Sequence, residues 1–136
     1  MRGISALEQL ESYHEAAADL VRAQGVDDVL ARIVRQVSTA IKAPASMLAV
    51  RLAGDPRPRV HRIGFARDDA EALADALERG EAPPPEAVEA TIETASARGH
   101  LLAVMPRGTT ASEHDRRVLA SFAGYAASAP EIVSAL

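Results

Sequence analysis

Four histidines are the side chains of this 136-residue chain that could bind a metal ion or a haem: His14, His61, His100 and His114. No two of them are spaced as neighbours on one helix face or one strand face, so the spacing predicts no metal site. His61 or His100 could ligate a haem iron, but a single histidine does not predict one, and the cofactor stays unknown. Cysteine is absent, which excludes disulfides, thiolate metal sites, thiol catalysis and thioether-linked chromophores.

Acid–base chemistry would be most concentrated in the run Glu113-His114-Asp115. A helix start explains the same acids, because carboxylates there cap free N–H groups and interact favourably with the helix dipole. The sequence shows no nucleophilic side chain paired with a general base in a recognisable pattern. The glycines lie in isolated turns rather than in a phosphate-binding loop. We therefore predict no catalytic residue and no enzymatic activity.

Ligand binding is the chemistry that the remaining polar residues suit. One face of the expected sheet would carry arginine and acidic side chains among apolar ones, and the predicted ligand-binding residues are Met47, Arg51, Arg62, Thr91, Glu93 and Leu102. They would form a shallow pocket under a helix at 68–79 and the proline loop at 83–85. The alternative is a solvated sheet face with cross-strand Arg–Glu pairs, each worth at most about 1 kcal/mol.

Length and composition set the class of protein. The chain is long enough for one domain, and 48% apolar with 25% charged residues is ordinary globular composition. The net charge of −4 argues against a general nucleic-acid-binding surface. No apolar run reaches the length of a membrane span and no signal peptide is visible, so we expect a cytoplasmic protein.

Hydrophobic periodicity predicts the elements that would position these residues. In chain order they are helices at 4–23 and 27–41, strands at 46–52 and 59–65, a helix at 68–79, strands at 88–94 and 100–105, and a helix from about residue 112. Gly25 should end the first helix, and the arginine-rich strand at 59–65 should be a sheet edge. Two antiparallel hairpins with segregated helices make an α+β domain.

The closing hairpin is predicted to turn at residues 96–99. A four-residue turn would place Ile92 opposite Ala103 on the face covered by helices, with Glu93 on the other face. The final helix should begin with a capping box, formed either by Thr110 with Glu113 or by Ser112 with Asp115. Its apolar stripe would contain Val118, Phe122, Tyr125 and Ala129, and Pro130 should restart a helix at its first position.

Two apolar helix stripes indicate a homodimer. The first helix has an a/d-like seam, and with the last helix it gives the predicted interface residues Leu7, Leu10, His14, Val21, Phe122 and Tyr125. The seam lasts about two heptads, whereas a coiled coil needs three or four. Packing of the first helix on its own domain is the alternative.

Two segments resemble the GAF domain family. The first, Val26-Asp27-Asp28-Val29-Leu30-Ala31-Arg32-Ile33-Val34, is similar to the GAF opening helix. The second joins the run from Arg98 to Val104 with Ser112 to Leu119 and Phe122-Ala123, and it is similar to the GAF closing strand and helix. The resemblance implies a GAF-like (PAS-like) antiparallel sheet of strand order 2-1-4-3, with long N- and C-terminal helices on one face. Many GAF domains carry a longer insertion than 66–87, so the pocket should be small or open.

The resemblance also implies a function and a domain organisation. Residues 1–24 would be a signalling or dimerisation helix, 25–129 the GAF-like domain with a short ligand-loop region, and 130–136 the start of a linker. The implied function is a regulatory sensor in a bacterial signalling protein, which binds a small polar ligand and passes its state through the terminal helices of a dimer. The expected output, by analogy, is a diguanylate cyclase domain in a longer natural chain. The alternative is a dimerisation module whose pocket has degenerated.

Overall fold

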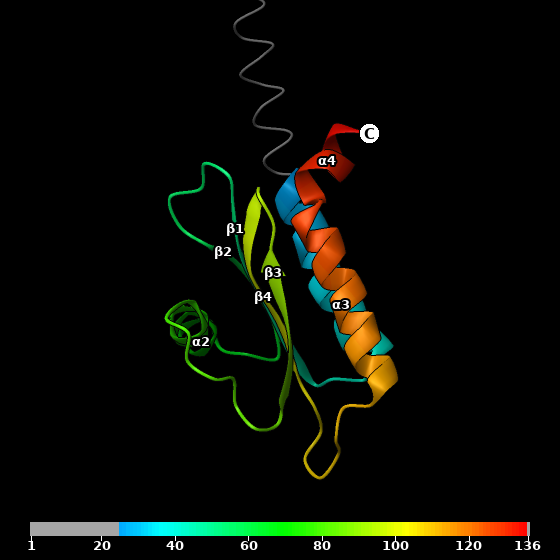
Figure 1. The fold of residues 1–136 in the computed structure, drawn as a ribbon. Helices are drawn as coiled ribbons and strands as arrows, with labels where there is room; N and C mark the ends of the chain where they lie inside the picture. Colours follow the sequence, from blue (N-terminus) through cyan, green and yellow to red (C-terminus); the bar gives the residue numbers. More distant parts are fainter. Residues whose placement is uncertain (1–24, 136) are drawn as a thin grey trace, which may run out of the picture.

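The computed structural model describes residues 25–135 and has the expected α+β architecture (Figure 1). Residues 25–40 are helical, and the elements that follow are β1 (Ala45–Leu52), β2 (Arg59–Ile63), α2 (Arg67–Glu78), β3 (Ala87–Glu93), β4 (Ala97–Val104), α3 (Glu113–Ala127) and α4 (Ala129–Ser134). The predicted helix at 4–23, with interface residues Leu7, Leu10, His14 and Val21, lies outside the described residues.

The four strands form one antiparallel sheet in the order β2-β1-β4-β3, as the resemblance implied. β1 and β4 are the central strands, because their near-continuous apolar sequences are buried on both faces. β2 is an edge strand, as its arginines indicated.

Helices cover the two sheet faces unequally (Figure 1). Residues 25–40 and α3 pack side by side on one face, while α2 lies alone on the other. Alternation along β1 sends Leu48 and Val50 to the larger core under the two long helices, and Met47 and Ala49 to the smaller core under α2. These face assignments agree with the sequence prediction.

The closing hairpin corrects the predicted register. Its turn lies at residues 94–96, where the Thr94 N–H donates to the Ala97 carbonyl at 2.8 Å, so β4 begins before the predicted turn has ended. Ile92 is opposite Gly99 rather than Ala103, and Ala103 is opposite Val88. The displacement is an even number of residues, so every side chain keeps its predicted face.

The helix boundaries confirm two predictions and correct two. Ser112 caps α3 through the capping box with Asp115, and Pro130 lies in the first turn of α4. The fully buried residues of α3 are Leu119, Ala123 and Ala126. Of the predicted stripe, Ala129 is fully buried, Val118 and Phe122 are half-buried against the larger core, and only Tyr125 is exposed. Gly25 is already part of the helix at 25–40, whereas it was expected to lie in the break before that helix. No helix within 25–135 is long and apolar enough to cross a bilayer.

Candidate functional site

A cavity of about 480 Å³ lies between α2 and the sheet face that α2 covers. It is lined from β1, β3, β4, α2 and the residue before β2: Ala49, Arg51, Pro58, Ala74, Leu77, Glu78, Thr91, Ile92, Glu93, Arg98, Gly99 and His100. Three of these residues, Ala49, Ala74 and Leu77, are buried apolar residues of the smaller core, whereas the side chain of Ile92 belongs to the larger core on the other face. The cavity therefore has an apolar floor with charged residues at its rim.

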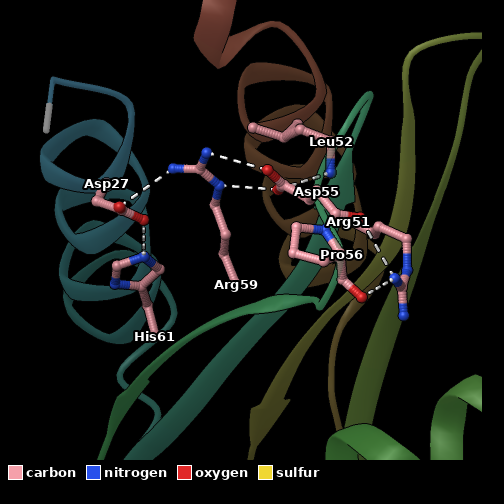
Figure 2. A network of polar contacts seen from close by, with 7 residues as sticks. All are labelled: Asp27, Arg51, Leu52, Asp55, Pro56, Arg59 and His61. Carbon is pink, nitrogen blue, oxygen red and sulfur yellow. Dashed lines mark hydrogen bonds and ion pairs between the residues drawn. The ribbon is translucent and has the colours of Figure 1, made fainter. Parts of the chain in front are cut away.

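Arg51 is held in place at the cavity by three polar contacts. Its Nη1 donates to the carbonyl of Pro56 at 2.8 Å and to that of Asp55 at 3.4 Å, as Figure 2 shows. Its Nη2 donates to Glu78 Oε1 at 2.9 Å, and this ion pair joins β1 to the last residue of α2. The guanidinium is thus fixed from one side by backbone and from the other by a carboxylate.

A network of ion pairs continues from the same turn to the helix at 25–40 (Figure 2). Arg59 donates to both carboxylate oxygens of Asp55, at 2.9 and 3.1 Å, and to Asp27 at 3.1 Å. His61 Nε2 lies 3.0 Å from the other oxygen of Asp27. Polar contacts therefore connect Arg51, at the cavity, with Asp27 on the helix.

The contact between Asp55 and Arg59 favours the charged form of both groups. The hydrogen bonds from Arg59 lower the pKa of Asp55, which partial burial alone would raise, and the Leu52 N–H adds a further bond to the carboxylate at 3.1 Å. The same contact with Asp55 raises the pKa of Arg59. Asp55 and Arg59 are consequently both ionised at neutral pH.

His100 and Glu89 form a second pair on this face of the sheet. His100 Nδ1 lies 2.6 Å from Glu89 Oε1, and both side chains are about four-fifths buried. His100 also lines the cavity. Within residues 25–135 no three His, Asp or Glu side chains gather closely enough to hold a metal ion. The charged side chains around the cavity could bind a polar molecule.

The structure brings together half of the predicted ligand-binding residues. Arg51, Thr91 and Glu93 line the cavity. Met47 and Leu102 have the predicted face but are fully buried in the smaller core, outside the lining. Arg62 is opposite Met47 in the register, yet it is solvent-exposed and does not line the cavity either.

Sequence reasoning missed Arg98, His100 and Glu78 as lining residues. Because the turn is predicted at 96–99, Arg98 is not part of the predicted strand. Its alternation with His100 and Leu102 could have shown that it shares their face of the sheet. Glu78 follows Ala74 by one helical turn, so the two share a side of α2. That spacing could have placed Glu78 over the sheet.

The two predicted interface residues of α3, Phe122 and Tyr125, differ in exposure. Tyr125 is 54% exposed, and its ring meets that of Phe122 edge-on, with ring centroids 5.8 Å apart. Phe122 is half-buried against the larger core. The structure holds one chain and therefore leaves the dimer a prediction.

Comparison with solved structures identifies the fold. The chain is similar to the GAF domain of an Acinetobacter phosphoenolpyruvate-protein phosphotransferase, with a TM-score of 0.59 and 13% identity, over 95% of this chain and 96% of that one. A search against protein families gives no match. A search against curated proteins gives none either. The strand order, the paired long helices on one face and this likeness agree, and the chain has the fold of a GAF domain.

Proposed function

We propose that this domain is a regulatory sensor that binds a small polar ligand in the cavity beneath α2. One observation carries the proposal: Arg51 is held by fixed backbone contacts at the rim of a cavity with an apolar floor. Small-molecule sites commonly combine an apolar lining with a few oriented polar groups, in volumes of about 300–1,000 Å³. The volume of about 480 Å³ is within that range.

Transmission through the terminal helices is the second part of the proposal. The contacts from Arg51 through Asp55 and Arg59 to Asp27 support it, because they connect the cavity to the helix at 25–40. The helix at 25–40 and α3 pack on the same core, so a displacement of one helix would shift the other. A diguanylate cyclase is the output domain proposed for a longer chain.

A thermal-shift screen tests ligand binding at this cavity. The screen covers cyclic nucleotides, purines, amino acids and small acids, bases and neutral metabolites, and a true ligand raises the melting temperature with the logarithm of its concentration. Arg51→Gln should weaken the binding of any such ligand about tenfold or more, since it removes a charged, oriented donor. Calorimetry on variants that keep the parent circular dichroism spectrum gives the affinities.

Arg62→Gln is the matched control for that substitution. Arg62 is on the same sheet face and carries the same charge, but it is exposed and outside the cavity lining. The ligand response should survive this change. A response that Arg51→Gln leaves untouched would place the ligand site elsewhere.

A dimerisation module is the second candidate function, and the exposed Tyr125 on the outer side of α3 favours it. We expect light scattering to give twice the monomer mass of 14.3 kDa. Tyr125→Lys should shift the mass toward the monomer, because a charge would replace a contacting ring. Ala120→Lys adds the same charge on the side of α3 beside β3 and should leave the dimer intact. A clean monomer at high micromolar concentration would exclude the dimer.

A further inference from the structure

Two arginines stand directly opposite each other at the cavity. In the register of the central strands, Arg51 of β1 is the partner of Arg98 of β4, and both line the cavity. Like charges in directly opposite positions of a sheet repel each other, which disfavours the empty arrangement. An anion between the two guanidinium groups would remove that repulsion.

Arg98 has an open position for such an anion. Glu93 is its partner on β3, but within the described residues no carboxylate comes within 4 Å of the Arg98 guanidinium. The side chain is exposed to solvent and belongs to the cavity lining. Its hydrogen-bond donors are therefore available to a bound molecule.

Arg51 already holds an anion, the carboxylate of Glu78, and the contact is one that a ligand could displace. The two side chains are 37% and 49% exposed, and ion pairs of that exposure contribute little to stability. Glu78 is the last residue of α2, where the helix dipole disfavours a negative charge, and the last turn contains no basic residue. The Pro56 carbonyl would keep the Arg51 guanidinium oriented after Glu78 leaves.

We propose that the cavity binds an organic anion whose carboxylate or phosphate group lies between Arg51 and Arg98 and takes the place of Glu78. The apolar body of the ligand would rest on the floor formed by Ala49, Ala74 and Leu77. This inference rests on the proposed sensory function and adds the class of ligand. It also gives the ligand a direct effect on the protein, because it frees the end of α2 from β1.

The test compares four probes with the same aromatic body. Phenylacetate and phenyl phosphate carry the two anionic groups, phenylacetamide is neutral, and 2-phenylethylamine is cationic. Calorimetry at constant ionic strength should show binding of at least one anion and a preference for it over the neutral and cationic probes. The stronger of the two anions then identifies the group as carboxylate or phosphate. Arg98→Gln should weaken that binding about tenfold.

Glu78→Gln gives the most specific result. This substitution removes the Glu78 carboxylate that competes with the ligand for Arg51. Binding of the anionic probe should tighten about two- to fivefold, the factor that corresponds to the free energy of an exposed ion pair. Glu81→Gln is the control, since it makes the same change in net charge three residues later. Glu81 pairs with Arg79 at 2.6 Å and does not line the cavity, so its loss should leave the affinity unchanged.

Several outcomes would overturn this inference while leaving the sensor intact. One is preferential binding of the neutral or cationic probe that Arg51→Gln abolishes. Another is weaker anion binding in Glu78→Gln, which would mean that Glu78 assists the ligand. A ligand from the broad screen with no anionic group would have the same consequence. Absence of any response, from the screen and from the probes alike, would reject both proposals.

Discussion

Gly99→Ala is expected to destabilise the domain by about 3 kcal/mol, a large effect for the addition of one methyl group. The new Cβ would lie 2.0 Å from the Ala49 carbonyl oxygen and 2.7 Å from the Val50 Cα. These are backbone atoms of β1, so no side-chain rotation can relieve the overlap. β1 and β4 would have to separate at the centre of the sheet. Urea unfolding measures the loss as a lower midpoint.

Gly124→Ala is the matched control. Gly124 is an α3 residue, and a Cβ added there meets nothing within 4 Å. Alanine has a higher helix propensity than glycine, so this change should stabilise the domain by about 0.5–1 kcal/mol. Opposite signs for the two substitutions would show that the cost at Gly99 arises from strand contact rather than from loss of glycine in general. Equal, small effects would mean that β1 and β4 are less closely paired than described.

Gly99 also explains why the register of the closing hairpin was mispredicted. Ser96 and Gly99 are typical turn residues, so the sequence alone predicts that the chain reverses at 96–99. The actual role of Gly99 is to allow two central strands to approach, while Thr94 closes the turn. Because an even shift leaves every side chain on its face, hydrophobic alternation could not reveal the error.

The faces of the sheet, by contrast, could be predicted from residue pattern alone. Leu48 and Val50 alternate with Met47 and Ala49, and the charged Arg51 continues the second set, which indicates that this set is on the less covered face. The α3 cap was similarly determined by local chemistry at Ser112. Strand order came from family resemblance, since nothing in the strands' own pattern specifies their neighbours.

The candidate site was only half predictable, for two physical reasons. Arg51 lines the cavity, and strand alternation alone predicts that it is on this face. Arg98 depended on hairpin register, and Glu78 on where α2 docks over the sheet, which is set by tertiary packing of Ala70, Ala74 and Leu77. Asp27 begins the predicted helix at 27–41, and nothing in the residue pattern indicates that its carboxylate pairs with Arg59 and His61 of β2.

Ala103→Asp should have the other large effect, a loss of about 3–5 kcal/mol in the free energy of unfolding. Ala103 is fully buried in the larger core, between Ser46 of β1 and Val88 of β3. A carboxylate there would be desolvated without a cationic partner, because its neighbours in that core are apolar except for Ser46, whose hydroxyl already donates to the Val34 carbonyl. The melting temperature should fall by about 10 °C or more.

Ala53→Asp introduces the same side chain at an exposed turn between β1 and β2, where the change should stay within about 0.5 kcal/mol. The stabilities of Ala103→Asp and Ala53→Asp also test the ligand site, because successive side chains of β4 point to opposite faces of the sheet. If Ala103 faces the core, then Leu102 and Arg98 face α2, and the opposed arginines belong to the cavity. A melting temperature for Ala103→Asp within a degree or two of the parent would mean a one-residue slip of β4. That slip would turn Arg98 away from the cavity and remove the basis for anion binding there.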